Sequence, residues 1–389
     1  AANSGSLELT TTPVEKLDLN NKSNGKAQIH DTTVSSMTAA NDGKLEANNL
    51  KGDKVGLTGA GNTNISDSNI KNIDANVSGN TEISHLTNNQ MTFANSGVIN
   101  ISESSSDNFD LTNTGETNVA NSEVKNLNAT NDGKLDLNAV TGSKYDLTSK
   151  GNVNINDSKI ANINSTISGN AIIDNLESTN MTSAVSGKSN ITNSSIAKLD
   201  LTNSGESVIK DSTVTAMTVA NNNGKLDVNN INGDKFDLTS SANSNIVDSN
   251  IKSVNAKNSG ELTATNLTSD KLVLTSEGNT NIDGSNVKSV DADNSGKLEV
   301  NSLTSDNLKL TSSGNANIAD SNVKSMNADV SGKLEANKIT SDKLVLTSKG
   351  DTLINNSEIT NVNANVSGKA TVNNLTNSQM SMTVSGETT

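Results

Sequence analysis

Short stretches in which apolar and polar residues alternate recur along this chain every 18 residues. A glycine marks the period, from Gly25 to Gly205 in steps of 18 and, after one step of 19, from Gly224 to Gly386, with Ala242 standing in once. Gly5 opens a 20-residue first unit, and 21 of the 27 glycines share this phase. Such self-similarity predicts a repeat architecture. We number each unit from its glycine as position 0.

Apolar residues recur at positions +2, +4, +12 and +14, with a fifth at +7 or +9. The unit that begins at Gly296 shows them as Leu298, Val300, Leu303, Leu308 and Leu310. Spacing by two predicts strands at +1 to +5 and +11 to +15, with a weaker third near +7 to +9. Ser, Asp or Asn precedes most of the period glycines, which is typical of turns in which glycine takes a positive φ.

A chain that turns three corners every 18 residues around a narrow apolar interior predicts an all-β fold, a single parallel β-helix (β-solenoid) of about 21 coils. Residues 1–24 form an atypical N-terminal coil, 25–385 the regular solenoid and 386–389 a C-terminal stub. At about 4.8 Å per coil, the rod is about 100 Å long. A right-handed coil is favoured over a left-handed hexapeptide helix, which needs an aliphatic residue every six positions, because +8 is usually polar.

Large and small residues alternate from coil to coil, so the true period is 36. The row at +14 reads Leu238, Ala256, Leu274, Ala292, Leu310, Ala328, Leu346, Ala364, and the row at +4 has the opposite phase, with Ala264, Ile282, Val300, Ile318, Ala336, Ile354. Equivalent positions of stacked coils are neighbours. We expect the larger side chains of one row to meet the smaller ones of the other, which fills a thin core.

Charge alternates in the same way at +10, where the row reads Asp234, Lys252, Asp270, Lys288, Asp306, Lys324, Asp342. Each charge then has opposite-signed neighbours in the coils above and below. A slip by one coil would misalign the whole row, so we interpret it as a structural charge ladder that fixes register.

Composition narrows the possible functions. The chain has 43 acidic residues, 29 basic residues that are all Lys, and a net charge of −14, which argues against binding nucleic acid or anionic membranes. Only 31% of residues are hydrophobic and 1% aromatic, and there is no Cys, hence no disulfide or thiolate metal site. No apolar stretch approaches the roughly 18 residues of a membrane span, so membrane insertion is not expected.

The Gly-terminated, Asn/Ser/Thr-rich repeats with paired inward aliphatic residues resemble secreted bacterial parallel β-helix proteins of the adhesin and haemagglutinin type. The resemblance rests on repeat style and covers nearly the whole chain. It implies a right-handed solenoid, extracellular exposure, and an adhesive or matrix role. Ala1-Ala2 is what cleavage of a signal peptide after small residues leaves, so we expect an extracellular or cell-surface protein.

Candidate chemistry follows the repeat. Carboxylates at +3 (Glu46, Asp136, Asp227, Glu299, Glu335) accompany lysines at +1 (Lys44, Lys134, Lys225, Lys297, Lys333). A catalytic site needs one local constellation rather than a copy in every second coil, so we predict no enzyme and no cofactor. His30 and His85 lie three coils apart, at solvated corners, and predict no metal site. Acidic corners leave weak calcium binding open.

Two function classes remain. One is a structural subunit that assembles head-to-tail with copies of itself into a surface or biofilm-matrix fibre; the alternative is a monomeric adhesin or stalk-like spacer for host-cell or glycan attachment. The proposed assembly ends are Ala1, Ala2, Asn3 and Ser4, which fit +14 to +17 of a preceding coil, and Gly386, Glu387, Thr388 and Thr389, which supply 0 to +3 of a following one. Pro13 and the longer first coil argue for the monomer.

Overall fold

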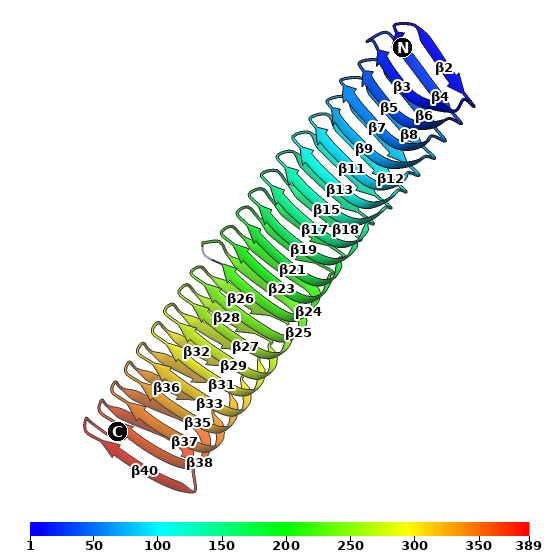
Figure 1. The fold of residues 1–389 in the computed structure, drawn as a ribbon. Helices are drawn as coiled ribbons and strands as arrows, with labels where there is room; N and C mark the ends of the chain where they lie inside the picture. The colour runs from blue at the N-terminus through cyan, green and yellow to red at the C-terminus, as the bar shows by residue number, and fades with distance from the viewer. Residues whose placement is uncertain (222, 389) are drawn as a thin grey trace. The chain divides into compact units, whose positions relative to one another are not determined.

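The computed structural model describes residues 1–221 and 223–388, and it confirms the predicted all-β parallel β-solenoid with an 18-residue coil, about 21 coils and no helices. The chain divides into two compact units. The first contains residues 1–190 and 194–196, and the second contains residues 191–193 and 197–389. Both units are built from the same coil, which consists of one short and one long strand (Figure 1).

In the first unit β1 (Ala2–Asn3) precedes the repeating pairs. The short strands are β2 (Ser6–Thr10), β4 (Lys26–His30), β6 (Lys44–Asn48), β8 (Asn62–Ser66), β10 (Asn80–Ser84), β12 (Val98–Ser102), β14 (Glu116–Ala120), β16 (Lys134–Asn138), β18 (Val153–Asn156) and β20 (Ala171–Asp174). The long strands are β3 (Val14–Asn21), β5 (Thr33–Asn41), β7 (Lys51–Gly59), β9 (Asn69–Val77), β11 (Thr87–Asn95), β13 (Ser105–Asn113), β15 (Glu123–Asn131), β17 (Thr141–Ser149), β19 (Lys159–Ile167) and β21 (Glu177–Val185).

Two strands, β22 (Ser189–Thr192) and β23 (Ser195–Asn203), contain residues of both units. In the second unit the short strands are β26 (Ser244–Val247), β28 (Leu262–Thr265), β30 (Thr280–Asp283), β32 (Leu298–Asn301), β34 (Ala316–Ala319) and β36 (Leu334–Asn337). The long strands are β27 (Asn250–Asn258), β29 (Thr268–Ser276), β31 (Asn286–Asn294), β33 (Thr304–Ser312), β35 (Asn322–Val330) and β37 (Thr340–Ser348). Short and long strands merge in β24 (Ser207–Asn221), β25 (Leu226–Ser240) and β38 (Thr352–Val366), and β39 (Ala370–Thr376) and β40 (Gln379–Val384) follow.

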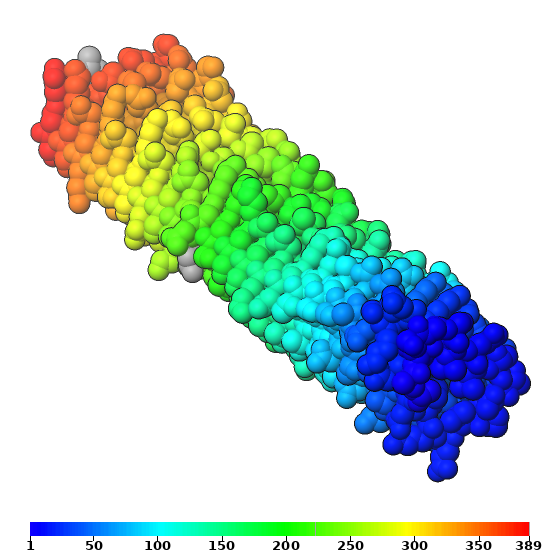
Figure 2. All heavy atoms as spheres, turned by 90° about the horizontal axis from the view of Figure 1, so that it is seen from above, coloured from blue at the N-terminus to red at the C-terminus, as the bar shows by residue number. Residues whose placement is uncertain are grey.

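Each strand pairs in parallel with its equivalents in the neighbouring coils, and the register is constant. In β11 and β13, for example, Met91 is opposite Phe109 and Phe93 is opposite Leu111, an offset of 18 residues. Figure 2 shows the atoms of successive coils in direct contact within each unit. A constant register places residues of the same position in rows along each unit, so the rows read from the sequence are physical neighbours.

The predicted third strand is not separate. Residues +8 to +16 form one nine-residue strand in most coils, such as Lys51–Gly59, and this strand bends where two successive residues, at +10 and +11, are both exposed. The corner before it lies at +6, where the residue takes a left-handed conformation with φ between 48° and 54° in the non-glycine cases. Asn and Asp dominate this position because their short polar side chains tolerate that conformation.

The prediction of positive φ at the period glycines is therefore wrong, and close approach between coils explains them instead. A Cβ atom added to Gly314 would lie 2.1 Å from the carbonyl oxygen of Gly296, and one added to Gly97 would lie 2.2 Å from that of Gly79. No Cβ fits at such distances. Glycine recurs because the backbone at this corner stacks directly on the corner of the preceding coil.

The interior is a stack of rows, as the sequence predicts. The alternating large and small residues at +14 and +4 are all buried. The aromatic residues at +12 and +14 are buried too, and the rings of Phe93 and Phe109 pack edge to face with centroids 6.0 Å apart. Tyr145 fits because +9 of its coil is Gly142, where a Cβ would lie 2.3 Å from the Tyr145 ring.

Burial at +14 predicts that enlarging a small member of this row destabilises the fold. Ala328→Leu would insert a third leucine between Leu310 and Leu346, to which Ala328 is paired in register. We expect a loss of about 1–3 kcal/mol from overpacking, measured by urea denaturation. The control is Asn327→Leu, because Asn327 is exposed on the same strand. Equal effects of the two substitutions would contradict the assignment of +14 to the interior.

Candidate functional site

The charge ladder lies on successive long strands of the second unit, and its charges pair two by two. Each lysine binds the aspartate of the preceding coil. Lys252 Nζ lies 2.6 Å from Asp234 Oδ1, and the corresponding distance is 2.5 Å both for Lys288 with Asp270 and for Lys324 with Asp306. Asp342 follows Lys324 in the row. The first unit repeats the arrangement in Asp53–Lys71 and Asp107–Lys125, each also at 2.5 Å.

Both neighbouring carboxylates act on each lysine of the row. The pKa of Lys288 is raised chiefly by its hydrogen bond and charge interaction with Asp270, and further by the charge of Asp306. The pKa of Lys252 is raised in the same way by Asp234 and then by Asp270. These side chains are exposed, so the pairs are screened by salt and contribute more to register than to stability.

The residues proposed as assembly ends occupy the coil positions that the sequence assigns to them. Ala2 and Asn3 in β1 pair with Asn20 and Asn21, and the Ala1 ammonium donates to the carbonyl of Asp18, whereas Ser4 is exposed. At the C-terminal end, the described residues 386–388 stack on the equivalent positions of the preceding coil. Gly386 stacks on Gly368, the carbonyl of Glu387 accepts from Ala370 N at 2.8 Å, and Thr388 pairs with Ala370. Thr389 lies outside the described residues.

A buried row of polar residues at +16 was missed by the sequence analysis. Asn113 shows its chemistry. Its Nδ2 donates to Asn131 Oδ1 at 2.6 Å, to Gly115 O at 3.0 Å and to Lys134 O at 3.1 Å, while its Oδ1 accepts from Asn95 Nδ2 and from Gly115 N. The amide side chains thus satisfy the backbone of the glycine corner. Asn two residues before glycine is visible in the sequence, but we took only apolar residues as interior.

Serine at +7 forms a second buried polar row, and in most coils it alternates with Leu, Ile or Val. Ser321 Oγ accepts from Leu303 N of the preceding coil at 3.1 Å and donates to Ala319 O of its own coil at 2.7 Å. The same bonds recur at Ser249 and Ser357. Serine is therefore the small residue of the 36-residue alternation at +7. Its hydroxyl group also donates to the carbonyl at +5, across the corner at +6.

Five of the carboxylates at +3 are each paired with the lysine at +1 of the same coil. Lys44 Nζ lies 2.5 Å from Glu46 Oε1, Lys134 lies at the same distance from Asp136, and the other three copies are paired in the same way. The hydrogen bond from Lys44 is the largest cause that lowers the pKa of Glu46, and a hydrogen bond from Gln28 lowers it further. A general acid near neutral pH needs the opposite shift.

Only His85 lies on a corner, as predicted for both histidines, because His30 is the last residue of β4. His85 is at +6, and its ring lies between two carboxylates, with Nε2 2.7 Å from Glu103 Oε2 and Nδ1 3.6 Å from Asp67 Oδ1. His30 is half-buried at +5. Among residues 1–221 and 223–388, no group of three or more His, Asp or Glu side chains is arranged to hold a metal ion.

The same residues include no helix long and apolar enough to span a membrane.

No protein-family model, curated protein or solved structure matches this chain.

The buried asparagine row predicts a large difference between inward and outward amides. Asn113→Ala removes the partner of Gly115 N and of the carbonyls of Gly115 and Lys134. We expect a loss of about 1–3 kcal/mol in the free energy of unfolding, because buried backbone groups lose their hydrogen bonds. The control is Asn118→Ala, since the half-buried Asn118 side chain donates to the side-chain oxygen of Asn100 and not to a backbone carbonyl. Urea titrations with equal midpoint shifts would show that the row is not stabilising.

The charge ladder predicts a pattern across a mutant series. Asp306→Lys places a third lysine between Lys288 and Lys324, so two attractive contacts become repulsive and the melting temperature falls, more at low salt than at high salt. Adding Lys324→Asp and Asp342→Lys restores alternation beyond Asp306 and should recover part of the loss. A triple variant that melts no higher than the single one would mean that these charges do not interact along the row.

Proposed function

We propose that this chain is a non-enzymatic structural protein, an extracellular β-solenoid subunit that assembles head-to-tail into a surface or matrix fibre. The supporting observation is that neighbouring coils within each unit pair in the same register, position against equivalent position. Backbone ladders, buried polar rows and paired charges all join position to equivalent position. A coil face that is not covered therefore offers a second copy the same groups that coils use inside each unit.

The first and last described coils have interior residues that are partly accessible. In the coil that contains β39 and β40, the interior positions are partly accessible; Met380 at +12 is 43% exposed, and Met382 and Val384 are half-buried. In the coil that contains β2 and β3, Leu7 and Leu17 at the interior positions +2 and +12 are half-buried as well. Stacking a second copy would bury apolar side chains of both, a favourable contact that does not close on itself.

The stubs at both ends are compatible with this contact. Ala2 and Asn3 occupy positions +15 and +16 of a coil. Gly386 to Thr388 occupy positions 0 to +2. Because these positions do not overlap, the two stubs can share one composite coil. The repeat style shared with secreted bacterial adhesins supports an extracellular site of action.

Assembly predicts that a charge on the coil face blocks fibres while a charge beside it does not. We expect Met380→Lys to abolish fibres in negative-stain micrographs and to lower the sedimentation coefficient, because stacking would bury an unpaired ammonium group. Ser381→Lys is the control, since Ser381 is exposed in the same strand, at an outward position. Deletion of residues 1–4 or 386–389 should weaken fibres if the composite coil forms.

A monodisperse particle from the intact chain at every concentration would overturn assembly. That result would instead support the alternative function, a monomeric adhesin or stalk-like spacer that displays its surface. Fibres that persist in Met380→Lys would show that copies associate through another face.

A further inference from the structure

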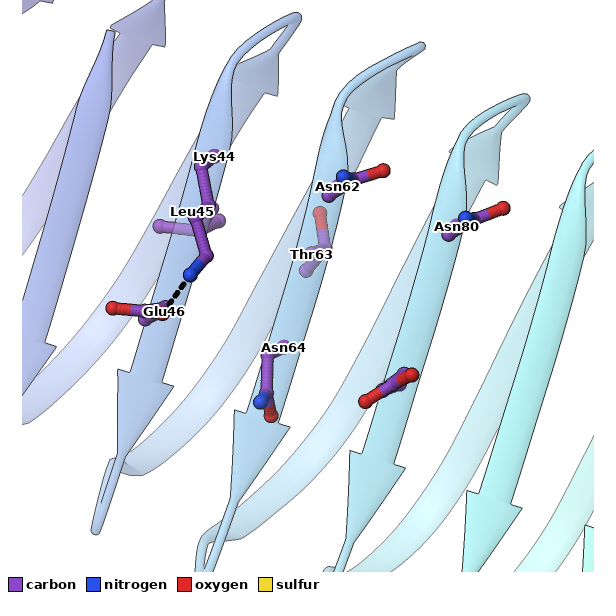
Figure 3. Close-up of a pocket in the computed structure, with 8 residues that line it drawn as sticks. Lys44, Leu45, Glu46, Asn62, Thr63, Asn64 and Asn80 are labelled. Atoms are coloured by element: carbon purple, nitrogen blue, oxygen red, sulfur yellow. Dashed lines mark ion pairs between the residues drawn. The ribbon is translucent and has the colours of Figure 1, made fainter.

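A polar groove of about 240 Å³ crosses three neighbouring short strands on the outer surface of the first unit. Lys44 and Glu46 lie on β6, Asn62 and Asn64 on β8, and Asn80 and Glu82 on β10. Figure 3 shows the Lys44–Glu46 pair on one side of the short asparagine side chains of the middle strand, with Asn80 on the other side. The longer side chains of Lys44, Glu46 and Glu82 on the outer strands therefore flank the asparagines of the middle strand.

Glu46 lines the groove, but its carboxylate bonds toward the preceding coil and does not bridge to the middle strand. Gln28 of the preceding coil donates to Glu46 Oε2 at 2.8 Å, and Glu46 has no hydrogen bond to Asn64 of the following coil among the described residues. In two other coils, the carboxylate at +3 accepts a hydrogen bond from the asparagine at +3 of the following coil. Asn154 Nδ2 donates to Asp136 at 2.5 Å and Asn245 Nδ2 donates to Asp227 at 2.7 Å, which joins the two strands across the same gap.

Four side chains of the groove are left without a protein partner. Within the described residues, no hydrogen bond or ion pair joins the side chains of Asn62, Asn64, Asn80 or Glu82 to another group. In other coils, side chains at the same positions have protein partners. Asn152 Oδ1 accepts from Asn170 N at 3.0 Å, and Glu335 at the position of Glu82 is paired with Lys333 at the position of Asn80.

These groups suit a neutral ligand that is rich in hydroxyl groups. Each amide offers both a donor and an acceptor, and the Glu82 carboxylate accepts hydrogen bonds only. A metal ion could not use the amide N–H groups and would face the Lys44 ammonium. An anion would face two carboxylates, while Lys44 is already bound to Glu46. A hydroxyl group both donates and accepts, so a sugar can satisfy all of these side chains.

We propose that this groove binds a short stretch of a neutral glycan, with Glu82 and the amides of Asn62, Asn64 and Asn80 as its ligands. The inference goes beyond the structural role and does not depend on it, because the groove lies on the outer surface of the coils and not on a face used for stacking. The binding surface is a local departure from the repeat, since one missing lysine at +1 leaves Glu82 free.

The test is titration calorimetry on the full chain with neutral hexasaccharides, using cellohexaose, maltohexaose and chitohexaose as probes. At least one should bind, with a dissociation constant in the millimolar range that is usual for small polar contacts on open surfaces. Asn80→Lys supplies the lysine that pairs with Glu335 elsewhere, so it should keep the fold and weaken binding at least tenfold. Glu82→Gln removes the carboxylate at nearly constant size and should also weaken binding.

The matched control is Asn170→Lys, which adds the same charge at the equivalent position of a coil whose +3 residue is Ile172 and should leave binding unchanged. Absence of binding by all three hexasaccharides, or equal binding by the native chain and Asn80→Lys, would overturn the proposal. Calcium chloride that binds alone, with loss in Glu82→Gln and no response to sugars, would reassign the groove to a cation. Micrographs of Asn80→Lys separate this result from fibre assembly, which that substitution should not affect.

Discussion

Direct stacking of one backbone corner on the next is the constraint on which the rest of this fold depends. At the period glycines the preceding coil leaves no room for a Cβ, since one added to Gly314 would lie 2.1 Å from the Gly296 carbonyl oxygen. Because that corner recurs at the same point of every coil, the strands stay in register even across the 19- and 20-residue units. A constant register keeps all other positions in rows, so each row can specialise in one kind of contact.

Each row stabilises the thin core through a different kind of contact. Aliphatic residues at +4 and +14 alternate in size, serine and leucine share +7, and asparagine at +16 bonds the glycine corner. A core this narrow places backbone corners close to its interior. Buried polar side chains are then needed, because an unpaired backbone group in that position costs more than the hydrogen bond that satisfies it contributes.

The same regularity supports a structural role and makes local departures informative. Ion pairs such as Lys324–Asp306 repeat with the coil and serve stacking, whereas Glu82 lacks the lysine that its equivalent Glu335 has in Lys333. A fibre needs identical steps, while recognition of a ligand needs a place where the steps differ. The proposed fibre therefore depends on the regularity of the repeat, and the proposed glycan groove depends on a local departure from it. The two can coexist because they use different surfaces of the coil.

The sequence by itself determined the coil length, the parallel β-solenoid and the inward rows, since an 18-residue glycine period and spacing by two leave few other ways to bury alternating aliphatic residues. It also placed Asp306 beside Lys324. The tertiary structure alone decided where positive φ occurs, which is at +6 and not at glycine, and which polar residues are buried. Those features depend on the distance between coils and on partners 18 residues away, such as Asn131 for Asn113. The groove beside Glu82 was likewise invisible, because the direction that Glu46 takes depends on Gln28 in the neighbouring coil.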